Sequence, residues 1–131
     1  SPFVTRLMRI FNAFFLLTGV AMSISAGLLD FPQNTLTNYI SFLMLILAAL
    51  SGLIGWNHFL PCILSGMLYF CFFFAEMYEY TGEKDFYDYM IRTADILLSD
   101  SNWYGILMLL PSLITVVHAM YARFRNREPV Q

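Results

Sequence analysis

The chain has 131 residues, of which 59% are hydrophobic and only 12% are charged, and its formal net charge is -2. Soluble domains carry roughly 25% charged residues, so this chain has too few charged side chains to coat a soluble core of its size. The small net charge, without a run of basic residues, argues against a nucleic-acid partner. The composition therefore predicts a protein surrounded by lipid.

Apolar residues form three long stretches, at residues 7–29, 38–74 and 103–124. One crossing of a bilayer core needs about 20 helical residues, so the middle stretch is too long for a single helix. A hairpin is indicated at Gly55-Trp56-Asn57-His58, and Pro61 then falls in the first turn of the next helix, where proline is tolerated. We therefore predict an all-α polytopic membrane protein, a single domain with four transmembrane helices at about 7–29, 38–56, 58–80 and 103–124.

The segment between the third and fourth predicted helices has a different pattern. Its apolar and small side chains recur at helical spacing, and charged residues occupy the positions between them. The apolar and small residues are Phe86, Tyr89, Met90, Thr93, Ala94 and Leu97. This pattern predicts an interfacial amphipathic helix over about residues 84–98, lying along the membrane surface. We expect a lipid or partner surface on this helix, formed by Phe86, Tyr89, Met90 and Leu97.

Charged residues divide unequally between the two sides of the predicted bundle. With four crossings, both termini and the Trp56 hairpin share one side, which carries five arginines and one glutamate and sums to +4. The other side carries eight acidic and two basic residues and sums to -6. Basic residues near helix ends mark the cytoplasmic or matrix-like side. Both termini are therefore expected on that side.

Small residues repeat at four-residue spacing on the first two predicted helices. Such repeats let the backbones of membrane helices approach closely. They predict helix contacts within the bundle, and the alternative is that one stripe faces another subunit. The residues concerned are Gly19, Ser23 and Gly27 on the first helix and Ala48 with Gly52, or Ser51 with Gly55, on the second.

Two histidines, His58 and His118, are expected at similar depth near the side that holds the termini. Histidines from two helices can hold a b-type haem between them. The alternative is that His58 lies in a polar hairpin and that His118 donates to a carbonyl or hydroxyl oxygen of a neighbouring helix. We expect bound lipids and no resident cofactor. A haem b is expected only if the two histidines serve as its ligands.

The sequence contains no nucleophile elbow, zinc-protease motif or phosphate-binding glycine loop, which predicts a protein that is not an enzyme. Glu76 follows a long apolar run directly, and an acid inside a membrane raises the hypothesis of an ion relay. However, Glu76, Glu79 and Glu83 share one helix face. That spacing favours a helix that emerges into water at this point.

Two short segments carry a resemblance to a known family. Arg9-Ile10-Phe11-Asn12 opens the first predicted helix, and Gly66-Met67-Leu68-Tyr69-Phe70 lies on the third. They resemble segments of the COPI-associated Golgi membrane proteins, which are small four-helix proteins with cytosolic ends. The resemblance implies a non-catalytic role in vesicle trafficking.

Three functions are consistent with these features. The first is an accessory subunit of a larger membrane complex, such as a respiratory or ATP synthase assembly of the mitochondrial inner membrane, with other transmembrane subunits and lipids as partners. The second is a Golgi or endosomal trafficking protein, as the resemblance implies. The third is a haem-binding anchor subunit of an electron-transfer complex, which would use both histidines.

Overall fold

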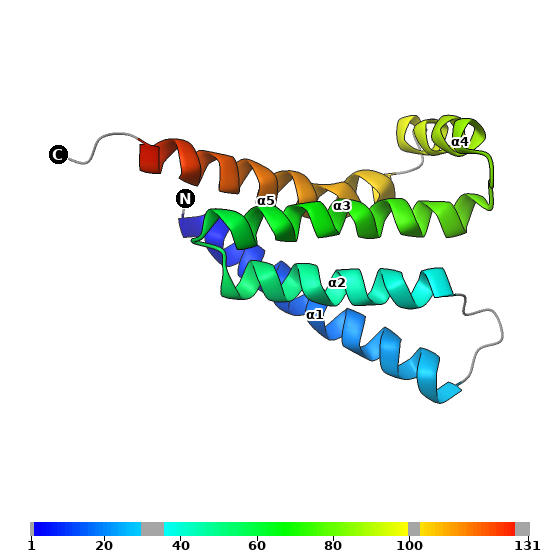
Figure 1. The fold of residues 1–131 in the computed structure, drawn as a ribbon, viewed down its shortest axis with the longest axis horizontal. Coiled ribbons are helices and arrows are strands. Elements are labelled where there is room, and N and C mark those ends of the chain that lie inside the picture. Colours follow the sequence, from blue (N-terminus) through cyan, green and yellow to red (C-terminus); the bar gives the residue numbers. More distant parts are fainter. Residues whose placement is uncertain (1, 30–35, 100–102, 128–131) are drawn as a thin grey trace.

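The computed structural model describes residues 2–29, 36–99 and 103–127, and the side chains of residues 2–25, 39–99 and 109–124. Over these residues the protein is all-helical, without strands, which confirms the all-α part of the prediction. Four long helices run alongside one another, and a short one lies at the end remote from the chain termini (Figure 1). The helices are α1 (Pro2–Leu29), α2 (Leu36–Ile54), α3 (Phe59–Thr81), α4 (Phe86–Leu98) and α5 (Trp103–Arg127).

The helix ends follow local chemistry. Helix α1 begins at Pro2, five residues before the predicted start, because the fixed φ of proline suits the first helical position. Helix α3 ends at Thr81 and is followed by Gly82, whose left-handed φ of 67° favours glycine. Helix α4 begins after Asp85, whose carboxylate accepts a hydrogen bond from the Asp88 backbone N–H at 3.2 Å. The remaining ends lie within about three residues of the predicted ones.

A tight hairpin joins α2 to α3 and confirms that the long apolar stretch divides into two helices. The Gly55 N–H donates to the Ser51 carbonyl at 2.9 Å, and the His58 N–H donates to the Gly55 carbonyl at 3.0 Å. A Cβ atom at Gly55 would lie only 2.1 Å from Cβ of Pro61. The close approach of the two helices therefore requires glycine at this position.

Helix α3 is the centre of the bundle. It packs between α2 and α5, while α1 packs on α2 and makes few contacts with α5. Along Figure 1, α1 diverges from α2 toward the end where α4 lies. Three buried clusters follow α3 from the end with the termini to the end with α4. They contain Met8, Trp56, Cys62 and Ala119, then Leu45, Ala48 and Tyr69, then Phe73, Met77 and Tyr89.

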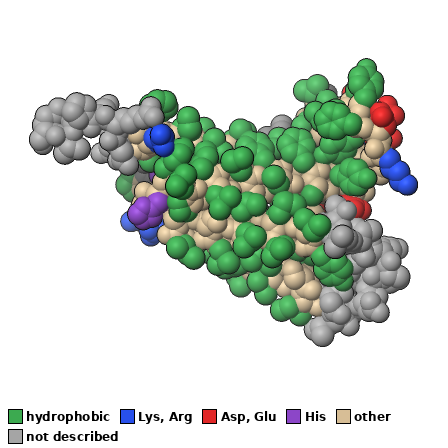
Figure 2. Space-filling view, in the orientation of Figure 1, with side chains coloured by type: hydrophobic (Ala, Val, Ile, Leu, Met, Phe, Trp, Pro, Cys, Tyr) green, Lys and Arg blue, Asp and Glu red, His purple; other side chains and the backbone are tan. Residues whose placement is uncertain are grey.

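The surface separates apolar from charged side chains. Hydrophobic side chains cover the middle of the visible face, and charged ones gather at its two ends (Figure 2). Among the residues whose side chains are described, two helices are long and apolar enough to cross a membrane by length and composition, namely α1, over Pro2–Ser25, and α3. Within the described side chains, α2 and α5 contribute shorter apolar segments, Tyr39–Ile54 and Leu109–Phe124.

Candidate functional site

Several polar side chains are buried between the helices. Burying a polar group is unfavourable unless it is hydrogen-bonded, and one of these groups is satisfied by a neighbouring backbone. The hydroxyl of Ser65 on α3 donates to the Ala48 carbonyl on α2 at 2.6 Å. The α2–α3 contact is therefore polar as well as apolar. The buried polar residues of the four long helices are Asn12, Ser41, Ser65, Ser112 and Thr115.

Asn12 lies on α1, and its side chain contacts both α2 and α3. Its side chain is 1% exposed, and its Oδ1 accepts a hydrogen bond of 2.5 Å from the Tyr69 hydroxyl. Gly52 leaves the space for this amide, because a Cβ atom at Gly52 would lie 2.6 Å from Nδ2 of Asn12. Nδ2 itself has no hydrogen-bond partner among the described residues. In the sequence, this site is marked only by one amide side chain, Asn12, within the apolar stretch of α1. No role was predicted for it.

The predicted small-residue contacts have different positions in the structure. A Cβ atom at Gly19 would lie 2.8 Å from Cγ1 of Ile46, so Gly19 permits close packing of α1 on α2. Ala48 is fully buried, and Gly52 faces Asn12. Ser23 instead donates to the Gly19 carbonyl of its own helix at 2.8 Å. Gly27 lies outside the residues whose side chains are described.

A second contact of this kind, between α3 and α5, was not predicted. A Cβ atom at Gly66 would lie 2.5 Å from Cγ2 of Val116, 3.3 Å from the Val116 backbone nitrogen and 3.4 Å from the Ser112 carbonyl oxygen. Two of these neighbours are backbone atoms, which cannot move aside as a flexible side chain can. Gly66 therefore sets the distance between the two helices.

His118 is part of a ring stack at the end of the bundle that holds the termini. Its imidazole lies on the Trp56 indole, with ring centroids 4.0 Å apart and an angle of 11° between the planes. Nε2 of His118 is 3.1 Å from the Trp56 carbonyl oxygen, and the indole N–H donates to the Thr5 hydroxyl at 3.3 Å. These contacts connect α1, the hairpin and α5.

The second predicted haem ligand, His58, has separate surroundings. It is exposed and precedes α3 without a side-chain capping hydrogen bond. Within the described part of the chain, no contact joins its ring to His118. A haem iron bound to Nε2 of His118 would have to replace the Trp56 carbonyl as its partner. The haem hypothesis therefore stays a prediction that requires this rearrangement.

Glu76 lies partly buried near the end of α3 that adjoins α4. Its carboxylate accepts a hydrogen bond from the hydroxyl of Ser41 on α2, and Ser41 is fully buried. Its Oε1 atom is buried and has no hydrogen-bond partner among the described residues. The carboxylate is therefore engaged in the α2–α3 contact and does not point freely into water. The ion relay stays a prediction.

The four residues of the predicted α4 surface have different surroundings in the structure. Phe86 and Met90 are exposed, whereas Tyr89 is buried and Leu97 packs against the cluster formed by Phe73, Met77 and Tyr89. The Tyr89 hydroxyl donates to the Phe74 carbonyl at 2.7 Å, and burial raises the pKa of this phenol, so it remains protonated and able to donate. The expectation that Tyr89 forms an outward surface is thus corrected, since its ring anchors α4 to α3.

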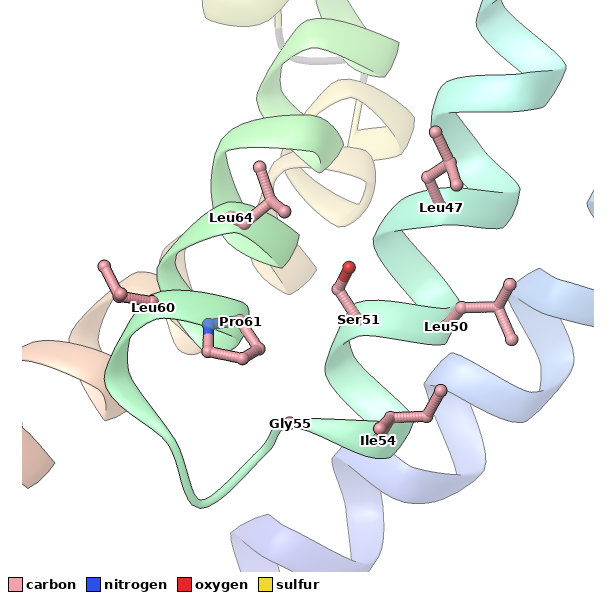
Figure 3. A pocket seen from close by; sticks show the side chains of 8 residues that line it. All are labelled: Leu47, Leu50, Ser51, Ile54, Gly55, Leu60, Pro61 and Leu64. Atoms are coloured by element: carbon pink, nitrogen blue, oxygen red, sulfur yellow. The ribbon is translucent and has the colours of Figure 1, made fainter.

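A groove of about 420 Å³ opens on the outer side of α2 and α3, next to their hairpin. Figure 3 shows that the side chain of Ser51 points toward the space between the two helices. Gly55 and Pro61 close the groove at the hairpin end. Its walls are aliphatic and partly exposed: Leu47, Leu50, Ile54, Leu60 and Leu64.

No protein-family model, curated protein or solved structure matches this chain. The resemblance to the COPI-associated Golgi proteins therefore stays a prediction. Its two segments do contain Asn12 and Tyr69, the buried pair that joins α1 to α3.

Proposed function

We propose that this chain crosses a bilayer four times, with both ends on the cytoplasmic or matrix-like side, and serves as a non-catalytic subunit of a larger membrane complex. The observation that carries the proposal is an apolar belt between two charged ends (Figure 2), by which we mean the exposed hydrophobic side chains of the four long helices, such as Leu17, Leu43, Met67 and Val117. Helix α2 has 19 residues and α5 has 25, which correspond to lengths of about 28 and 37 Å. A hydrocarbon core about 30 Å thick is crossed by helices of roughly 17 to 25 residues, so both helices have lengths suited to cross with α1 and α3.

The charges at the ends support the proposed orientation. The N-terminal end of α1, the C-terminal end of α5 and the α2–α3 hairpin lie together (Figure 1). Arg6, Arg9 and Arg123 belong to this end, and the Arg123 guanidinium lies 4.6 Å above the ring of Phe59. The described acidic residues of the other end lie near the end of α3 and on or next to α4. Basic residues close to helix ends are retained on the cytoplasmic or matrix-like side.

The orientation can be tested by cysteine labelling in sealed vesicles. In Asn57→Cys the thiol lies at the hairpin, and in Asp95→Cys it lies on the exposed polar face of α4. A membrane-impermeant maleimide should label only one of the two from outside, and permeabilisation should expose the other. The parent chain is the control, because Cys62 is buried and Cys71 lies in the apolar belt. Labelling of both variants from one side would contradict four crossings.

The groove between α2 and α3 supports a role as a subunit. In lipid, helices associate through small residues that permit close packing, and Ser51 with Gly55 provides such a surface between aliphatic walls (Figure 3). A neighbouring transmembrane helix can bury these walls and satisfy the Ser51 hydroxyl. A respiratory or ATP synthase assembly is the kind of complex we favour for this role.

Filling the groove should release the partner subunits. We expect Ser51→Phe to lose the transmembrane proteins that accompany the parent chain in mild detergent, as measured by quantitative mass spectrometry. The matched control is Leu17→Phe, which places the same ring on α1 at a side chain that is 70% exposed. The control should retain them. A parent chain that purifies as a lone monomer would overturn the subunit role.

A further inference from the structure

A recess of about 340 Å³ lies between the end of α3 and the start of α4. Aromatic rings form most of its lining, and two residues of opposite charge complete it where the chain passes from one helix to the other. The principal lining residues are Phe74, Tyr78, Phe86 and Tyr89, with Glu83 and Lys84. The recess therefore combines an apolar floor with one carboxylate and one ammonium group.

The walls of this recess are fixed by the fold. Gly82 reverses the chain in the left-handed conformation, with φ of 67°, and Asp85 caps the first turn of α4. The hydroxyl of Tyr89 is bonded to the Phe74 carbonyl, which holds α4 against α3. Phe86, on the first turn of α4, is 75% exposed. The site is thus formed by the chain alone and remains open on one side.

The charges near the recess favour a zwitterionic ligand. Within the described residues, neither Glu83 nor Lys84 forms an ion pair. Lys84 can attract a phosphate, but the acids that lie close to it along the chain repel a headgroup with a net negative charge. These acids are Glu79, Asp85 and Asp88. A ligand with both a phosphate and a primary ammonium group satisfies both residues, since Glu83 can accept hydrogen bonds from the ammonium.

We propose that this recess binds one phospholipid with a primary-amine, zwitterionic headgroup. The phosphate lies at Lys84, the ammonium lies at Glu83, and the acyl chains extend along Phe74, Tyr78 and the exposed apolar belt. This inference rests on the proposed membrane location, in which α4 lies at headgroup level. Aromatic rings are favoured at this level because they have both an apolar body and a polar edge.

Native mass spectrometry of the full chain tests this site. The detergent-purified protein is mixed with equal amounts of dioleoyl phosphatidylethanolamine, phosphatidylcholine and phosphatidylglycerol. We expect the phosphatidylethanolamine adduct to exceed each of the other two several-fold. Glu83→Lys should remove the preference over phosphatidylcholine, because it replaces the carboxylate that accepts hydrogen bonds from the primary ammonium, whereas Asp95→Lys should retain it, because Asp95 lies on the polar face of α4 outside the recess.

Three results separate the possible failures. Equal binding of the three lipids, or an unchanged preference in Glu83→Lys, would overturn the lipid site. Phe86→Ser, which removes an apolar wall, should weaken retention of phosphatidylethanolamine without changing helix content by circular dichroism, and unchanged retention would also count against the site. Release of the chain from membranes by alkaline washing would instead overturn the membrane location on which the site depends.

Discussion

Gly66→Leu should destabilise the protein by about 3 kcal/mol, the upper part of the range for an overpacked core. Even a Cβ atom at this position would lie 2.5 Å from Cγ2 of Val116 and 3.4 Å from the Ser112 carbonyl oxygen. Relief requires α5 to move away from α3, which opens the contact between the central helix and its neighbour. The measurement is the midpoint of thermal unfolding in detergent, followed by circular dichroism and by size-exclusion chromatography.

The adjacent residue provides the control for this variant. Met67 is 58% exposed on the apolar belt, so Met67→Leu should change stability by no more than about 0.5 kcal/mol. Gly66→Ala should fall between the two, because a methyl group meets the same atoms with less volume. If Gly66→Leu unfolds at the temperature of the parent chain, α3 and α5 do not pack at this distance.

The contrast between Gly52 and Gly66 shows what a sequence pattern can identify. Gly52 was predicted because Ala48 precedes it by four residues on the same helix. Gly66 was missed because its importance comes from Val116, which lies 50 positions later in the chain on a different helix. Small-residue repeats are a property of one helix, whereas a tight contact is a property of two. The small-residue surface of one helix could therefore be predicted from the sequence, but the contact between Gly66 on α3 and Val116 on α5 could not.

Helix α4 shows a similar limit. Its periodicity predicted the helix and its apolar side. That side is wide, however, and the fold uses one part of it, at Tyr89 and Leu97, to cover α3. Phe86 and Met90 are left exposed. A pattern of apolar positions does not say whether the chain itself or its surroundings will cover them, because the answer depends on how the preceding turn directs the helix.

The surroundings of His118 also depend on a residue that is distant in the sequence. The ring partner of His118 is Trp56, which lies 62 positions earlier in the chain. Helix topology placed both residues at one end of the bundle but did not distinguish a carbonyl oxygen from a haem as the partner of His118. In the structure its Nε2 atom lies 3.1 Å from the Trp56 carbonyl oxygen.

Tyr69→Phe should cost about 1 to 3 kcal/mol, because it removes the donor that satisfies Oδ1 of the buried Asn12. The ring and its packing remain, so the effect isolates the hydroxyl group. The control is Tyr121→Phe on α5, where the side chain is 62% exposed and loss of the hydroxyl should have little effect. Stability is measured as the free energy of unfolding during titration of a mild detergent with a denaturing one.

The double variant Asn12→Leu with Tyr69→Phe distinguishes a true hydrogen bond from simple proximity. Each single variant leaves one buried polar group unpaired, whereas the double variant removes both groups at once. Its loss of stability should therefore be smaller than the sum of the single losses, by about 0.6 kcal/mol, the average for hydrogen bonds between membrane helices, and by at most about 1.7 kcal/mol. Strictly additive losses would mean that the two groups do not interact, and α1 would then be held to α3 by packing alone.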